Sequence, residues 1–179
     1  MAICNLTQAI SGSSTCDDYK VPGVAALYLV NEADLSGTTS QAIQQDSIGL
    51  VTGLTLVSGA SLYNIAFAEG TCFFNVTEAI NGGTRNFTHS LTFGVVANTQ
   101  QILYSLKQIG IGRFLALVQT NDESWRLVGV DSKRLRATAL TDISGQASGD
   151  DVVTTVTIEG VSKQLAPFVD DAVIAALGL

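Results

Sequence analysis

The sequence predicts a mainly β (α+β) fold, an antiparallel β-sandwich or curled sheet with one flanking helix near residues 98–110. Two observations lead to this class. Residues 72–96 hold two runs rich in aromatic and β-branched residues, separated by Asn81-Gly82-Gly83. Such runs around a glycine pair are typical of a β-hairpin. Further short apolar runs have the length of strands, whereas one stretch after the hairpin has a helical period.

The glycine pair predicts which hairpin residues face each other. Glycine adopts positive φ without steric cost, so Gly82 and Gly83 suit the centre of a tight turn. Asn81 then pairs with Thr84, and one strand face is mostly apolar while the other is polar and uncharged. A slip of one residue would mix the two faces. The polar face supplies a candidate assembly or channel-lining surface, which includes Asn75, Thr77, Thr88 and Ser90.

The chain ahead of the hairpin divides into an arm and the start of a domain. Residues 1–20 are small, polar and irregular, and residues 21–179 are expected to form a single β-rich domain. Between the first strands, residues 35–47 are interpreted as a long polar loop or a frayed helical turn, and long structureless segments often make interactions. Short apolar runs predict strands over residues 24–30, 48–57 and 62–67.

The helix is predicted by its caps and by its apolar face. Asn98, followed three residues later by Gln101, is typical of a capping box, and Gly110 is placed to end the helix. We expect this helix to lie across the sheet. Its apolar face is expected to contain Ile102, Leu103, Leu106 and Ile109.

Three strands and a tail are expected after the helix. The first two strands are apolar on both faces near their middles, which predicts central positions, covered by the helix on one side. A Gly/Ser-rich loop at 144–149 precedes the third strand. Pro167 lies near the first turn of a short helix, or tail, over residues 165–178. The three strands are predicted at residues 113–119, 125–130 and 151–159.

Composition indicates contacts with other protein chains. Of the 179 residues, 14% are charged and 46% are hydrophobic, and the mean hydropathy is +0.33. Globular chains average about 25% charged residues, so this surface has few charges to keep copies apart. No apolar run approaches the length of about 18 residues that a membrane helix needs. We therefore expect a homo-oligomer and no membrane partner.

The net charge of −7 is unevenly distributed along the chain. Residues 1–84 and 137–179 are acidic, whereas residues 85–136 carry an excess of bases. Among these bases, Lys133, Arg134 and Arg136 are further candidates for the assembly or lumen surface. Opposed blocks favour head-to-tail contacts between copies, unless folding mixes them. An acidic chain is a poor nucleic-acid binder, and the basic cluster lacks the interleaved aromatics of single-strand binders.

The sequence contains no recognisable catalytic, cofactor or metal motif. His89 is the only histidine, and the register puts it about three residue pairs from Cys72, too far for a nucleophile–base pair. Cys4 and Cys16 lack further ligands nearby for zinc. We expect no enzyme, no cofactor and no metal. The start of the chain lacks the features of a signal peptide, which predicts synthesis in a reducing, intracellular place.

The order of elements resembles virion proteins from phages of the crAss-like group. The resemblance spans most of residues 1–160, as a pattern of apolar positions and turns. It begins with Cys4 and Cys16 ahead of the run 23–31, and it continues where the helix runs into residues 110–118 and then 125–130. It implies a tail-tube-like subunit, made in the host cytoplasm and located in the virion tail. The resemblance implies no catalytic residues in this chain, because such families have none.

The resemblance also implies partners. Copies are expected to form a ring, most simply a hexamer, and rings to stack, with other tail proteins as neighbours and DNA only as passing cargo in an acidic lumen. The loop 35–47 and residues 48–67 are candidate inter-ring contacts. Deletion of residues 36–46 is expected to stop stacking and to leave the fold intact. The alternative is a virion-borne or secreted β-sandwich that binds carbohydrate or a host surface through exposed aromatics, for which the candidates are Trp125, Tyr28, Tyr63 and Tyr104.

Overall fold

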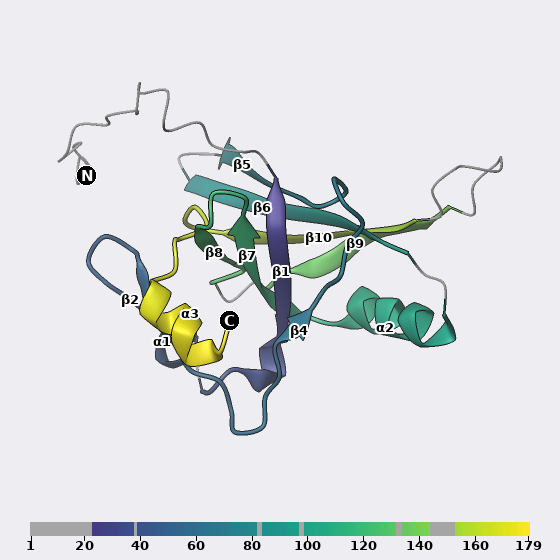
Figure 1. Cartoon of the computed structure of the whole chain (residues 1–179). Helices are drawn as coiled ribbons and strands as arrows, with labels where there is room; N and C mark the ends of the chain where they lie inside the picture. The colour runs from purple at the N-terminus through teal and green to yellow at the C-terminus, as the bar shows by residue number, and fades with distance from the viewer. Residues whose placement is uncertain (1–22, 38, 82–83, 97–98, 132–133, 144–152) are drawn as a thin grey trace.

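A computed structural model describes residues 23–37, 39–81, 84–96, 99–131, 134–143 and 153–179 (Figure 1). The fold is mainly β, with two open four-stranded antiparallel sheets and a two-stranded one. The predicted class, antiparallel sheets with a flanking helix, is confirmed. The predicted arm over residues 1–20 and the loop at 144–149 lie outside the described residues.

The first sheet is built on the predicted hairpin. Phe73 pairs with Thr92 and Asn81 with Thr84, so the predicted register is confirmed; Gly82 and Gly83 lie outside the described residues. The edge strand β9 (Arg136–Asp142) was not predicted from the sequence. In spatial order the strands are β5 (Phe73–Asn81), β6 (Thr84–Val95), β10 (Thr154–Ser162) and β9 (Arg136–Asp142).

The second sheet runs across the first in Figure 1. Its central strands β1 and β7 pair along nearly their whole length, for example Leu29 with Ala116. Strand β8 was expected at the centre but lies next to the edge, where a short bridge between Arg126 and Phe168 extends the sheet. In spatial order the strands are β4 (Tyr63–Asn64), β1 (Val24–Asn31), β7 (Phe114–Thr120) and β8 (Trp125–Val128).

The second sheet is buried on both faces, which explains its continuous apolar runs. One face meets the first sheet in a core that includes Leu29, Ala116 and Phe93. The other face carries Leu115 and Leu117 into a second core, which α3 and β3 help to close. The molecule is therefore layered: the β5-β6-β10-β9 sheet, a core, the β4-β1-β7-β8 sheet, and a second core.

The segment expected as a polar loop is part of this second core. Leu35, Ala42 and Ile43 are at most 7% exposed. They belong to a chain of short elements, namely η2 (Glu32–Asp34), α1 (Thr39–Ala42), β2 (Ile43–Gln45) and β3 (Val51–Leu54). The long-loop interpretation of 35–47 is thus wrong, because apolar residues spaced among polar ones supply the buried contacts. The alternative, a helical turn, agrees with α1. The strands expected over 48–57 and 62–67 shrink to β3 and β4.

The helix α2 (Gln100–Ile111) lies at the side of the first core rather than across a sheet. Thr99 caps it, its side chain accepting a hydrogen bond from the backbone of Ile102, whereas Asn98, the predicted cap, lies outside the described residues. The helix continues through Gly110. Leu106 and Ile109 are buried as predicted, but Leu103 is 40% exposed.

The C-terminal helix α3 (Asp171–Leu177) begins later than Pro167 suggested. The backbone of residues 167–169 is instead bonded to strands: Leu127 donates to the Pro167 carbonyl and Val51 to that of Phe168. Asp170 caps the helix through its side chain, which accepts from the backbone of Ala172. None of the helices in the described ranges is long and apolar enough to cross a membrane.

Candidate assembly surface

The outer face of the β5-β6-β10-β9 sheet contains all four hairpin residues singled out from the sequence. Asn75 lies opposite Ser90, and Thr77 lies opposite Thr88. The register carries the same face onto β10, where Glu159 lies next to Ser90. Besides these, it includes Phe73, Ala79, Thr84, Asn86, Thr92, Gly94, Arg136, Ala139, Thr141, Thr155, Thr157 and Val161.

This outer face carries almost no charge. Among its described residues only Arg136 and Glu159 are charged, and they pair opposite each other, so the face is neutral. Seven threonines and a serine supply most of its polar atoms. The Thr92 and Thr157 hydroxyl oxygens are 3.1 Å apart across the strands. Proteins rarely expose a wide surface without mixed charges. The face therefore has the chemistry of a surface that meets another chain or a passing ligand.

The outer face arises because successive side chains along each strand point alternately inward and outward. Leu91, Phe93, Val156 and Ile158 point inward and are 0% exposed, which fixes the polar partners of each strand outward. Threonine suits an exposed strand position because its β-branched side chain fits the pleat. The neutral face is thus compatible with a stable sheet, and its lack of charge is not required by the fold.

Both edges of this sheet are open in the part of the chain that the structure describes. Strand β5 pairs only with β6, and β9 pairs only with β10. Strand β5 is nine residues long and contains neither lysine nor proline, the residues that usually protect an edge. Unpaired N–H and C=O groups along such an edge are a template for a strand of another chain.

The predicted basic cluster does not stay together. Arg136 lies on the outer face described above, and Lys133 lies outside the described residues. Arg134 was expected at the surface but is only 4% exposed. Its burial follows from the adjacent Leu135, which is 0% exposed and pairs with Phe114, so that the chain enters the core at this point.

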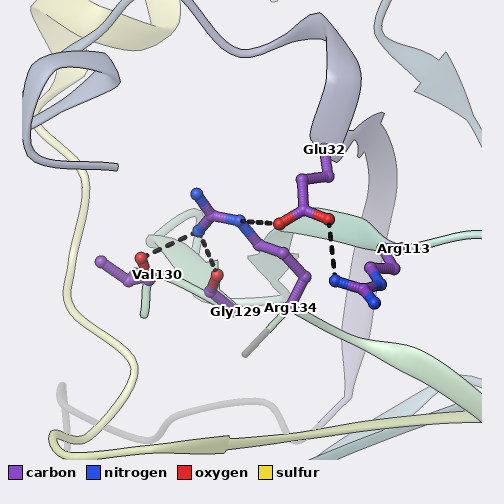
Figure 2. Close-up of polar contacts among 5 residues, drawn as sticks. All are labelled: Glu32, Arg113, Gly129, Val130 and Arg134. Carbon is purple, nitrogen blue, oxygen red and sulfur yellow. Dashed lines mark hydrogen bonds and ion pairs between the residues drawn. The ribbon is translucent and has the colours of Figure 1, made fainter. Parts of the chain in front are cut away.

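Arg134 ties a turn to the end of β1 (Figure 2). Its Nη1 donates to the carbonyl oxygens of Gly129, at 2.6 Å, and Val130, at 2.8 Å. Its Nε lies 3.9 Å from Glu32 Oε1, while Glu32 Oε2 is 3.6 Å from Arg113. Burial lowers the pKa of Arg134, whereas Glu32 and Asp131 act in the opposite direction. Arg134 therefore has a structural role: it holds the turn at Gly129 and Val130 close to the end of β1.

Cys72 and His89 are buried in the first core and its margin. Burial raises the pKa of the Cys72 thiol to about 12, the opposite of what a nucleophile requires. His89 Nε2 lies 3.0 Å from the Gln164 carbonyl oxygen, and its ring meets Phe74 edge-on. Burial lowers the pKa of His89, despite the Gln164 carbonyl and Asp131, which raise it. A neutral imidazole donating through Nε2 fits this environment.

His89 makes the stability of the fold sensitive to acid. Its pKa in the folded state is lower than in the unfolded chain, so its contribution is complete above about pH 6.5, the ordinary histidine value, and is lost below it. His89→Gln can keep a donor to Gln164 but does not titrate. We expect the stability difference between wild type and variant to narrow as the pH falls from 7 to 5. Urea unfolding followed by Trp125 fluorescence measures the free energy of unfolding of both proteins at each pH. If the two free energies change in parallel with pH, His89 does not cause the acid sensitivity.

The aromatic residues proposed for sugar binding do not gather on one surface. Trp125 and Tyr28 pack against each other, with ring centroids 6.0 Å apart, at the second core. Tyr63 and Tyr104 are about half exposed, on β4 and α2. Within the described ranges, no group of three or more His, Cys, Asp or Glu side chains is placed to hold a metal ion.

Sequence reasoning missed half of the outer face. The residues contributed by β10 and β9, such as Thr155, Thr157 and Thr141, were not recognised as continuing the hairpin's polar face. The alternation over residues 151–159 was visible, but pairing of β10 with β6 joins segments about sixty residues apart. No protein-family model, curated protein or solved structure matches the chain. The functional argument therefore depends on this surface.

Proposed function

We propose that the chain is a structural subunit of a phage tail, which assembles into a tail tube or tail ring around a channel for DNA. The observation that carries the proposal is the neutral, threonine-rich outer face of the β5-β6-β10-β9 sheet. The described part of this face has one acid and one base. A wide face with so few charges is most simply explained if it lies between or inside assembled copies rather than in open solvent. The resemblance to crAss-like phage virion proteins points to the same class.

The outer face suits a channel lining for DNA. Binding to the DNA backbone depends on Lys and Arg that neutralise phosphates. Arg136 is the only base among the described residues of this face, and Glu159 lies opposite it. A hydroxyl-rich, neutral lining neither holds nor repels DNA strongly, so DNA can slide. This differs from the acidic lumen expected from the sequence, because Glu159 is the only acid among the described residues of this face.

The open edges supply a means of closing a ring. Strand β5 of one copy can pair with β9 of the next, which continues the sheet from copy to copy. The contact is between two different edges, so it closes into a ring when the rotation between copies permits. Six copies remain the proposed number. The outer faces of all copies then meet around one axis.

A charge placed on the outer face tests this arrangement. In Thr88→Lys, ring closure brings one new lysine from every copy toward the axis, where like charges repel. We expect assembly to weaken by about tenfold at low salt and to recover near 1 M salt, where the screening length is about 3 Å. Sedimentation velocity over a concentration series measures the assembled fraction.

Glu123→Lys is the matched control, because Glu123 is exposed in the turn between β7 and β8, outside the outer face and the candidate inter-ring segments. It is expected to assemble like the wild type at every salt concentration. The channel proposal fails if Thr88→Lys also assembles normally at low salt, because the outer face would then not be shared by neighbouring copies.

A further inference from the structure

The apolar inner face of β5 extends beyond the core that it covers. Phe74 pairs with the buried Leu91, and Val76 and Ile80 follow at even spacing on the same face. Phe74 packs against the first core, Val76 is half-buried, and Ile80 is 61% exposed. Apolar sheet faces are normally packed against another element. Among the described residues, the cover of β5 thus ends before its apolar face does.

A groove lies beside this part of β5. It has a volume of about 450 Å³ and separates β5 from the turn between β7 and β8. Phe74 and Val76 line it from β5, and Arg126 lines it from β8. The Arg126 guanidinium already lies over the Phe168 ring, 4.4 Å from its centroid. The groove therefore offers mainly apolar contacts to a segment that enters it.

The described part of the chain begins at this groove. Gly23 is one of its lining residues, and the Gly23 carbonyl accepts a hydrogen bond of 3.2 Å from the backbone of Asn121. Residues 1–22 are therefore attached at the groove itself. An extended chain of that length reaches at most about 75 Å, while the strand from Phe73 to Ile80 spans about 24 Å. The segment is long enough to lie along the whole face, and its attachment keeps it at a high effective concentration there.

The chemistry of residues 2–10 matches an apolar groove. They contain no charged side chain. Cys4 and Leu6 alternate with Asn5 and Thr7. In an extended segment, this alternation gives one mainly apolar side and one polar side. Such a segment can bury its apolar side on β5 without burying a charge.

We propose that residues 2–10 lie in this groove along the inner face of β5 of the same chain, with Cys4 and Leu6 directed at the sheet. The groove is assigned to the chain's own segment because Gly23 ends that segment at the groove. The contact covers apolar surface that the free subunit otherwise exposes. It lies on the opposite side of the sheet from the outer face, so it goes beyond the proposed function and does not depend on a ring.

Disulfide trapping tests this contact, because Cys4 lies in the proposed segment. Val76→Cys places a thiol on the inner face of β5, and Thr77→Cys, the matched control, places one on the outer face of the same strand. Cys72 is buried, which raises its pKa to about 12 and keeps it unreactive. Each variant is oxidised with glutathione disulfide in dilute solution, and circular dichroism checks its fold. Peptide mapping identifies the linked cysteines, and gel electrophoresis shows whether they belong to one chain.

The expected result is an intrachain disulfide between Cys4 and the new thiol of Val76→Cys, formed about tenfold faster than the corresponding link in Thr77→Cys. Adding Leu6→Asp to Val76→Cys is expected to slow the link about tenfold, because burying an unpaired carboxylate is costly. Adding Thr7→Asp, on the polar side of the segment, is expected to leave the rate unchanged.

Equal rates in Val76→Cys and Thr77→Cys would overturn the proposal, and so would equal effects of Leu6→Asp and Thr7→Asp. A disulfide that joins two chains would assign the groove to a second copy and would also overturn it. The ring is tested separately by the assembly of Thr88→Lys, so failure of this contact leaves the proposed function standing.

Discussion

Arg134→Met is expected to lower the free energy of unfolding by about 3–5 kcal/mol. The guanidinium donates to the Gly129 and Val130 carbonyls, both of which belong to buried residues. Methionine fills a similar volume but donates nothing, and each buried carbonyl left without its donor costs about 1–3 kcal/mol. Urea unfolding of wild type and variant, followed by Trp125 fluorescence, measures the difference.

Arg113→Met is the matched control for this prediction. Arg113 contacts the same carboxylate, that of Glu32, but its side chain is 52% exposed. An exposed ion pair contributes about 1 kcal/mol at most, so this variant is expected to unfold nearly like the wild type. Equal losses in the two variants would show that the Glu32 ion pairs, rather than the buried carbonyl contacts, hold the turn.

Deletion of residues 36–46 is expected to abolish the native fold, which corrects the expectation from the sequence that it would stop stacking and leave the fold intact. The deletion removes Ala42 and Ile43, which are 0% and 6% exposed in the second core. It also removes β2, the partner of β3, and so exposes Val51, which is 0% exposed in the intact chain. Large core side chains cost about 2–5 kcal/mol each when lost, and a domain is typically stable by only about 5–15 kcal/mol.

The double variant Gln44→Ala and Gln45→Ala is the control for the deletion, because both side chains are exposed within the same segment. It is expected to fold normally. Circular dichroism and cooperative urea unfolding compare the two proteins. A deletion variant that unfolds cooperatively, with native-like Trp125 fluorescence, would contradict the account of the second core.

Elements whose structure depends on neighbouring residues in the sequence could be predicted from the sequence pattern. The hairpin register follows from alternation and from the position of the glycine pair, and Phe73 does pair with Thr92. The helix α2 was recognisable from its period. Its exact cap was not, because Thr99 can accept a hydrogen bond at the helix start as well as Asn98 could.

Long-range pairing determined what local pattern could not. Strand β9 follows a basic segment and lies at an exposed sheet edge, so apolar and polar residues alternate only weakly along it. Its pairing with β10 is what makes it a strand. Arg134 was assigned to the surface because charged residues are rarely buried. The carboxylate that faces it, that of Glu32, belongs to a residue about a hundred positions earlier in the chain. Of the candidate surface, the hairpin half was predictable and the β10 and β9 half was not.

The central claim is that the outer face of the β5-β6-β10-β9 sheet is enclosed when copies assemble. Electron microscopy of the assembled full-length chain tests it most directly, at a resolution that traces the strands. The account predicts a ring in which Asn75, Thr77, Thr88 and Ser90 face the central channel, with β5 of each copy beside β9 of its neighbour. An assembly with this face directed outward to solvent would contradict it.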